Sequence, residues 1–317
     1  MDRLQLDKNA KLTGRVYFKD EVMWLGLSGS GASFTFDGTK LVLKLKGDNI
    51  AVGDNPIDYA RIAVYVDGKR VVDEMIDCAE KEVMVIGRTE SAKSVVEIIK
   101  LSESPMSAIG IEAFTEGSAE ALPEKPLKIE FIGDSITCGY GVDDEDENHQ
   151  FTTATEDVTK AYAYKTAKAL DAEYSMFSAS GYGIVSGYTE GDEPISEQTI
   201  PQFYCSYGFS RGNFTGTAPQ DIPWDFSKYV PQIIVINLGT NDDSYCRDHK
   251  DRQAVFSKLY ADFLAVVREK NPQDFLENRV GVERKNAEND SVAIVSQISD
   301  DALDKLVSFA LQSTTNG

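Results

Sequence analysis

The first third of the chain is a series of short apolar runs of the kind that form β-strands. Runs such as VYFKD, SFTFDG and RIAVYVDG are rich in β-branched and aromatic residues, and Gly or Asp interrupts them at intervals of roughly 8–12 residues. This spacing predicts a β-sandwich over residues 1–120. Two Asp-Gly pairs inside alternating apolar runs, at 37–38 and 67–68, predict β-hairpins over residues 33–47 and 63–74.

The apolar period changes after the small, polar, proline-containing stretch 117–126, which we interpret as a linker. Continuous apolar strands are predicted at 127–133, 174–178 and 229–238, with helices at 157–170 and 252–272. A further strand at 291–299 and a last helix at 300–312 complete the pattern. Strands that alternate with helices predict an α/β domain with a mostly parallel sheet over residues 126–317.

Polar loops follow three of these apolar strands. They are Gly133-Asp134-Ser135, Ser180-Gly181-Tyr182-Gly183 and Gly239-Thr240-Asn241-Asp242. Because ligand sites of parallel sheets lie at the carboxyl ends of the strands, we expect the loops to meet at one site. Together they offer a hydroxyl group, backbone N–H groups on glycines and a side-chain amide, which are the parts that acyl transfer needs.

Composition restricts the partners. The net charge of −20 argues against nucleic acid and against an anionic membrane surface, because both need clustered Lys and Arg. No stretch approaches 18 apolar residues, and no basic start precedes an apolar segment, so we expect a cytoplasmic protein without a membrane span, although secretion stays open. The four cysteines form no C-x-x-C pair and are expected to be reduced. No cofactor and no metal are predicted.

The three loops resemble the first three sequence blocks of the SGNH (GDSL-type) hydrolases. FIGDSITCGYG, SASGYG and NLGTND carry the resemblance, and the sandwich in front makes the chain similar to carbohydrate esterase family two over residues 1–272. The resemblance implies a jelly-roll domain followed by a flavodoxin-like hydrolase domain. It implies Ser135 as the nucleophile, with the backbone N–H groups of Ser135 and Gly181 and the side chain of Asn241 as the oxyanion hole. Asp134 is expected to orient the turn.

The resemblance stops before the general base. The family supplies a histidine in a late D-x-x-H or W-H-P block, and the sequence after Pro272 contains none. The two histidines present are His149, in the acidic run that begins at Asp143, and His249, before the 252–272 helix. Both are interpreted as solvated residues, with a role as the base kept as the alternative. An altered C-terminus, a binding protein without turnover and an unrecognised base all remain open.

The stretch 203–226 is rich in aromatic residues and glycine and has no clear period. A loop of this length often forms a lid or a wall of a site. Tyr204, Tyr207 and Trp224, with Tyr182 of the second loop, are predicted to contact substrate, and packing under the loop is the alternative. Trp24 is expected in the sandwich core or between domains.

The leading functional hypothesis is a serine esterase that removes O-acetyl groups from plant polysaccharides or oligosaccharides of the xylan or mannan type. One alternative is an impaired esterase fold that binds acylated carbohydrate without turnover. The other is a GDSL-type lipase or acyl esterase.

Overall fold

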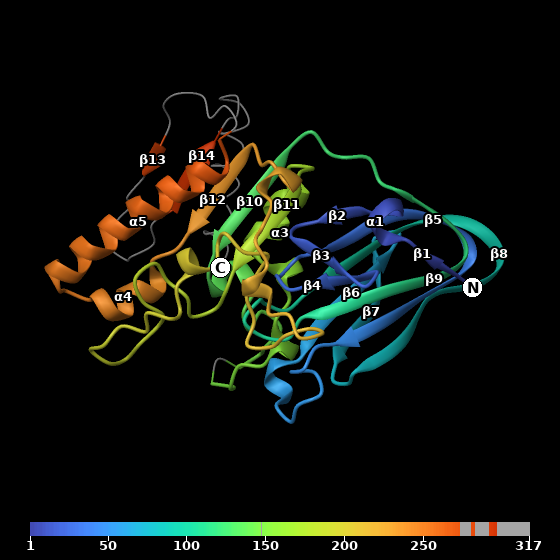
Figure 1. Cartoon of the computed structure of the whole chain (residues 1–317), viewed down its shortest axis with the longest axis horizontal. Coiled ribbons are helices and arrows are strands. Elements are labelled where there is room, and N and C mark those ends of the chain that lie inside the picture. Colours follow the sequence, from blue (N-terminus) through green and yellow to red (C-terminus); the bar gives the residue numbers. More distant parts are fainter. Residues whose placement is uncertain (147, 273–279, 283–291, 297–317) are drawn as a thin grey trace. The chain divides into compact units, whose positions relative to one another are not determined.

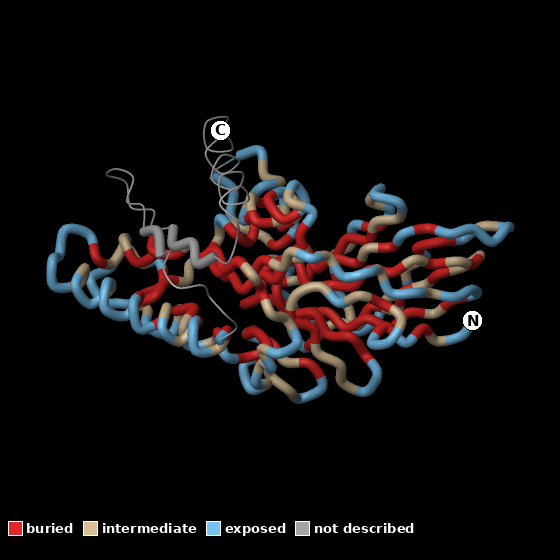
Figure 2. Tube along the Cα trace, turned by 90° about the horizontal axis from the view of Figure 1, so that it is seen from above, coloured by how far each residue is buried: buried red, intermediate tan, exposed pale blue. Residues whose placement is uncertain are grey.

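The computed structural model describes residues 1–146, 148–272, 280–282 and 292–296 of the chain. Its contacts divide it into two units. Unit 1 comprises Met1–Glu124, Gly139–Thr159 and Ser206–Trp224, and unit 2 comprises Lys125–Cys138, Lys160–Cys205 and the described residues from Asp225 onward. Each unit encloses its own buried positions, drawn red in Figure 2.

Unit 1 is a β domain. Its described residues contribute nine strands to one hydrogen-bonded sheet, in the order β3-β4-β9-β5-β8-β6-β7, with β1 on β9 and β2 on β5 (Figure 1). The strands are β1 (Asp2–Leu4), β2 (Lys11–Thr13), β3 (Val16–Lys19), β4 (Val22–Leu25), β5 (Gly31–Gly47), β6 (Ala60–Val66), β7 (Lys69–Ile76), β8 (Glu80–Lys100) and β9 (Ile109–Ala121).

The core of unit 1 follows from alternation along these strands. In β5, Phe34, Phe36, Leu41, Leu43 and Leu45 are buried, and polar or half-exposed residues stand between them. A period of two holds within the phenylalanine pair and within the three leucines, and the register shift between Gly38 and Lys40 brings the two groups to the same face, where all five side chains join the main apolar cluster of the unit. The predicted all-β domain is therefore confirmed.

One predicted hairpin is confirmed and the other is wrong. Asp67 and Gly68 join β6 to β7 with φ of 51° and 77°, the left-handed conformation that a two-residue hairpin turn requires. Asp37 and Gly38 instead lie inside the 17-residue strand β5, at a shift of register. A Cβ on Gly38 would overlap Gly117 of β9, so close strand approach, not a turn, explains this glycine.

Two segments from beyond residue 124 complete unit 1. They are Gly139–Thr159 and Ser206–Trp224, a division that the linear boundary expected near residues 120–126 did not anticipate. β9 also continues to Ala121, so the first half of the predicted linker is strand. Trp24 is 2% exposed and stacks on Phe214 with ring centroids 4.5 Å apart, in an apolar cluster of unit 1 that is separate from its main one.

Unit 2 is an α/β domain built on a sheet of order β11-β10-β12-β14-β13. Its strands are β10 (Lys128–Gly133), β11 (Glu173–Ser178), β12 (Ile233–Asn237), β13 (Val280–Val282) and β14 (Val292–Ser296). The β10, β11 and β12 strands are parallel, as predicted, whereas β14 runs antiparallel to β12 and lies between β12 and β13.

The helices are short, with one exception. They are α1 (Leu6–Asn9) in unit 1, and α2 (Ser135–Cys138), α3 (Tyr162–Ala169), α4 (Thr240–Cys246) and α5 (Lys250–Lys270) in unit 2. Single 3-10 turns are η1 (Pro56–Asp58), η2 (Thr153–Thr155), η3 (Val158–Lys160), η4 (Ile200–Gln202), η5 (Pro219–Asp221) and η6 (Phe226–Lys228).

The predicted long helix corresponds to α5, which buries Tyr260, Phe263 and Val267. The predicted helix over 157–170 is limited to α3, after a 3-10 turn. The last predicted helix lies outside the described residues. Among the described helices, none combines the length and the apolar character that crossing a bilayer would require.

Candidate active site at the carboxyl ends of three strands

The register of the unit 2 sheet brings the three polar loops together. Gly133, the last residue of β10, lies opposite Ser178 of β11 and Asn237 of β12. Neighbouring strands are about 4.8 Å apart, so the loops that follow these three residues begin side by side. The predicted convergence of the three loops at one edge of the sheet is confirmed.

Ser135 is the first residue of α2 and is half-buried. The buried Asp134 directs the turn before it, because its Oδ1 accepts the Ile136 N–H at 3.1 Å while its carbonyl accepts the N–H groups of Thr137 and Cys138. A Cβ at Gly133 would overlap Thr137 Oγ1. The glycine and the aspartate therefore both serve the tight turn that precedes Ser135.

Gly181 lies in the second loop in the left-handed conformation, with φ of 79°. Apart from its chain neighbours, no described residue has an atom within 4 Å of the place where a Cβ would stand, so the backbone conformation is what calls for glycine here. Its carbonyl accepts the N–H of Tyr188 at 2.8 Å, and the Tyr188 side chain is 55% exposed. Sequence reasoning missed Tyr188, because its link to Gly181 is a backbone hydrogen bond seven residues along the loop.

Asn241 joins the third loop to the second. It is 7% exposed, and its Nδ2 donates to the Tyr182 carbonyl at 2.8 Å. An amide nitrogen carries two hydrogens, so this bond leaves one donor for a ligand. The preceding Gly239 has a φ of 132°, which lets the chain leave β12 and enter α4 at this point.

Asp242 is a second link between these loops, which the sequence analysis did not assign. Its buried carboxylate accepts the N–H groups of Ile184, Val185 and Ser186 at 2.6–3.1 Å. Burial raises the pKa of this carboxyl above 3.8, although the hydrogen bonds from the three backbone N–H groups favour the charged form and act in the opposite direction. The carboxylate thus holds the loop that contains Gly181 next to the loop that contains Asn241.

Tyr204 and Tyr207 are core residues, which corrects their predicted role as surfaces for sugar. Tyr204 is fully buried, and its hydroxyl donates to Glu130 Oε2 at 2.8 Å within unit 2. Tyr207 is 1% exposed, and its hydroxyl donates to the Trp24 carbonyl at 2.6 Å within unit 1. Each hydroxyl donates its hydrogen bond to a partner inside its own unit. The alternative prediction, that these two tyrosines pack beneath the loop, therefore holds.

Tyr182 and Trp224 are half-buried. The Tyr182 ring lies 6.3 Å from that of Phe203, in unit 2. Trp224 belongs to unit 1, where the guanidinium of Arg15 stands 5.3 Å from its ring centroid. Both residues keep part of their surface open to solvent, and their contact with substrate stays a prediction.

Both histidines are exposed. His149 belongs to unit 1, and its Nδ1 lies 2.8 Å from Asp144 Oδ1. His249 belongs to unit 2 and immediately precedes α5. Within the described part of either unit taken alone, no three metal-ligating side chains cluster closely enough to hold an ion. All four cysteines are free.

Family models match nearly the whole described chain. Residues 12–126 match the carbohydrate esterase 2 N-terminal domain, and residues 129–284 match the GDSL-like lipase/acylhydrolase domain. The boundary between the two matches falls where unit 2 begins.

Curated relatives share both parts. The chain is 33% identical over 249 residues to cellulase/esterase CelE of Acetivibrio thermocellus, an alignment that covers 77% of this chain and 27% of the relative. It is 28% identical to an acetylxylan esterase/glucomannan deacetylase of Cellvibrio japonicus, covering 84% of this chain and 70% of the relative. The chain therefore spans about a quarter of the length of CelE.

A solved structure extends the likeness to three dimensions. It is a family two carbohydrate esterase from Clostridium thermocellum in complex with cellohexaose, 27% identical, with a TM-score of 0.69 over 84% of this chain and 75% of that one. The two family models, the curated relatives and this solved structure agree, and the chain belongs to the GDSL-type hydrolases of carbohydrate esterase family two.

Proposed function

We propose that the chain is a carbohydrate esterase that removes O-acetyl groups from plant polysaccharides or oligosaccharides of the xylan or mannan type. The observation that carries the proposal is the meeting of the three loops at the ends of β10, β11 and β12, where Asn241 and Asp242 bond directly to the second loop. The names of the relatives support the acetylated carbohydrate as the substrate class.

In this proposal Ser135 is the nucleophile. Its Oγ attacks the acetyl carbonyl carbon, and the resulting oxyanion accepts hydrogen bonds from the backbone N–H groups of Ser135 and Gly181 and from Asn241 Nδ2. When the tetrahedral intermediate collapses, the C–O bond to the sugar breaks and the sugar oxygen takes up a proton. Water then hydrolyses the acetyl-serine, releasing acetate and restoring Ser135.

A general base must take the serine proton, and we propose to test His149 first. Its Nδ1 lies 2.8 Å from Asp144 Oδ1 and its Nε2 lies 3.8 Å from Asp146 Oδ2, so carboxylates that can orient an imidazole face both ring nitrogens. His249 is the second histidine to test. If the base is His149, its replacement by Ala lowers kcat by on the order of 10⁴ or more, whereas the His249 variant keeps wild-type turnover.

The experiment that tests the function is hydrolysis of 4-nitrophenyl acetate and release of acetate from acetylated xylan and glucomannan. The Ser135→Ala variant is the matched control. Turnover that disappears in Ser135→Ala supports the proposal, and equal rates in the two proteins contradict it. Comparison of acetyl with octanoyl esters separates a carbohydrate deacetylase from a lipase, because the latter prefers the longer chain.

The second candidate function is carbohydrate binding without turnover. The observation in its favour is that the sequence beyond Pro272 contains no histidine. Oligosaccharide binding by calorimetry, together with activity no higher than that of Ser135→Ala, would support this function over the first.

A further inference from the structure

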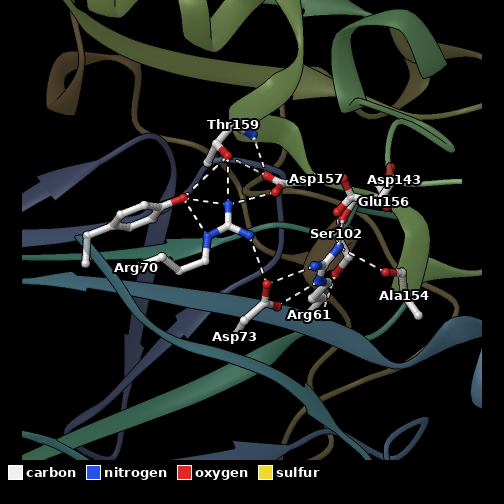
Figure 3. A network of polar contacts seen from close by, with 10 residues as sticks. Arg61, Arg70, Asp73, Ser102, Asp143, Ala154, Glu156, Asp157 and Thr159 are labelled. Atoms are coloured by element: carbon white, nitrogen blue, oxygen red, sulfur yellow. Dashed lines mark hydrogen bonds and ion pairs between the residues drawn. The ribbon is translucent and has the colours of Figure 1, made fainter. Parts of the chain in front are cut away.

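The segment Gly139–Thr159 directly follows the helix that carries Ser135, yet it packs in unit 1. Gly139 is covalently joined to Cys138, the last residue of α2, so the segment starts only four residues after Ser135. Unit 1 therefore holds the chain at the point where it leaves the proposed nucleophile helix. Two arginines of the sheet, Arg61 on β6 and Arg70 on β7, make the principal polar contacts (Figure 3).

Arg70 binds the segment through Asp157. Its Nη2 lies 2.7 Å from Asp157 Oδ2, and the Asp157 side chain is fully buried. The other oxygen of the same carboxylate, Oδ1, accepts the N–H and the hydroxyl of Thr159 at 3.0 and 2.6 Å. Arg70 Nη2 also donates to Thr159 Oγ1. A buried carboxylate of this kind requires its cation, because an unpaired charge in the interior is strongly unfavourable.

The side chain of Arg61 binds the backbone of the same segment. Its Nη1 donates to the carbonyls of Ala154 and Glu156 at 2.9 and 3.2 Å and lies 2.9 Å from Asp143 Oδ2. Asp143 is thus an ion-pair partner of Arg61. Asp73 of β7 bonds to both arginines, at 2.8 and 2.9 Å, so Figure 3 shows one connected network.

The network reaches the base of the segment through Asp157. The Asp157 backbone N–H donates to the Gly139 carbonyl at 3.3 Å, and Gly139 has a φ of 80°. A Cβ on Gly139 would overlap the Asp157 carbonyl, so the backbone at residue 139 and the backbone at residue 157 are in direct contact. A continuous path runs from Arg70 to Asp157, then to Gly139, and then along the covalent chain into α2.

We propose that Arg70 and Asp157, supported by Arg61, are positioning residues for α2 and therefore for Ser135. In this view the contacts of Gly139–Thr159 within unit 1 hold the chain at the residue that follows α2. The catalytic part of this inference rests on the proposed function, since it takes Ser135 as the nucleophile. Misplacement of a reacting group by about 1 Å can cost about 10²-fold in rate, so a loosened α2 should lower kcat more than it raises KM.

The test compares Arg70→Ala and Arg70→Lys with Arg88→Ala. Arg88, on β8, is a matched control because it also donates to two carbonyls and a hydroxyl within unit 1, those of Gly38, Ala92 and Ser94, and makes no described contact with residues 139–159. The readout is hydrogen exchange of the peptide 134–142, which contains the α2 amides of Thr137 and Cys138 that donate to the Asp134 carbonyl.

We expect Arg70→Ala to speed exchange in this peptide by at least tenfold relative to wild type, with Arg70→Lys in between and Arg88→Ala unchanged. Equal exchange in Arg70→Ala and wild type overturns the proposal, as does an equal increase in Arg88→Ala. Arg70→Lys retains the positive charge, so it provides the measurement if Arg70→Ala does not fold.

Turnover of 4-nitrophenyl acetate supplies the second readout. We expect kcat of Arg70→Ala to fall about 10- to 100-fold, with KM changed by less than about threefold. Absence of serine-dependent turnover in the wild type contradicts the proposed function alone, and the exchange result then decides the anchoring of α2. Normal kcat in Arg70→Ala beside an active wild type overturns the positioning of Ser135.

Discussion

Asp242 offers the sharpest test of the site geometry, because one carboxylate holds three backbone donors of the neighbouring loop. Its Oδ1 accepts the N–H groups of Ile184, Val185 and Ser186, while Oδ2 adds only a second contact to Ile184. Asp242→Ala removes every acceptor and leaves buried donors behind. Asp242→Asn keeps an oxygen at the Oδ1 position and loses the charge and the Oδ2 contact.

The expected magnitudes follow from this difference. Each buried donor without a partner costs about 1–3 kcal/mol, so Asp242→Ala should destabilise the protein by about 3–5 kcal/mol after relaxation and entry of water. Asp242→Asn should cost about 1–2 kcal/mol. Loss of one oxyanion donor costs about 10²–10³ in kcat, and a displaced Gly181 loop should therefore lower kcat of Asp242→Ala by about 10²-fold.

Thermal unfolding and hydrolysis of 4-nitrophenyl acetate measure the two effects. Asp225→Ala is the control, because Asp225 is an exposed aspartate of unit 2 that also accepts a backbone N–H, from Ser227, away from the three loops. The reasoning is refuted if Asp242→Ala unfolds at the same temperature as Asp225→Ala, or if an active wild type and Asp242→Ala share one kcat. The unfolding measurement does not depend on turnover.

Two further predictions concern buried acid and exposed aromatic groups. Burial and the neighbouring Glu103 carboxyl hold the pKa of Glu156 well above 4.5. The folded state therefore binds the proton more tightly than the unfolded state, and the stability from this group is lost as pH rises from about 4.5 through the folded pKa, by up to about 1.4 kcal/mol per pH unit. Glu156→Gln should flatten this dependence in pH-resolved thermal unfolding, and an unchanged slope would contradict the assignment. Tyr188 is exposed, and its backbone N–H donates to the Gly181 carbonyl. Tyr188→Ala should raise KM for acetylated oligosaccharides about tenfold and leave the unfolding temperature unchanged. Tyr207→Phe should lower stability by about 1–2 kcal/mol and leave KM unchanged, because the Tyr207 hydroxyl is buried and bonded. The opposite assignment of the two effects in steady-state kinetics and unfolding would show that Tyr207, not Tyr188, faces the substrate.

The meeting of the three loops at the carboxyl ends of β10, β11 and β12 was predictable because the sequence signals for it are local. Continuous apolar runs predict buried parallel strands, and polar loops directly after them lie at the strand ends. Gly133 faces Ser178 and Asn237 in register, as those two features together require. The sequence does not reveal that Asp242 binds the loop at 184–186, since aspartate after asparagine is equally suited to a helix start.

The two Asp-Gly pairs show where local signals fail. The same dipeptide makes a hairpin turn at Asp67-Gly68 and lies within a continuous strand at Asp37-Gly38. The difference arises from pairing with β8 and β9, whose residues lie more than fifty positions away in the sequence. Tyr204 and Tyr207 were misjudged for the same reason, because their partners Glu130 and Trp24 lie 74 and 183 residues away.

In the segment Gly139–Thr159 a local sequence signal is visible, but the long-range contacts that decide its structure are not. Its acidic residues are visible in the sequence, and a run of carboxylates after a turn is ordinarily solvated. Asp143 and Asp157 instead pair with arginines 82 and 87 residues earlier in the sequence, on β6 and β7 of the same unit 1. An ion pair needs both charges, so neither the strands β6 and β7 nor the segment Gly139–Thr159 predicts the network from its own sequence. A hydrolase domain defined by sequence as residues 126–317 therefore omits Arg61 and Arg70, the two side chains that hold its chain beyond Ser135.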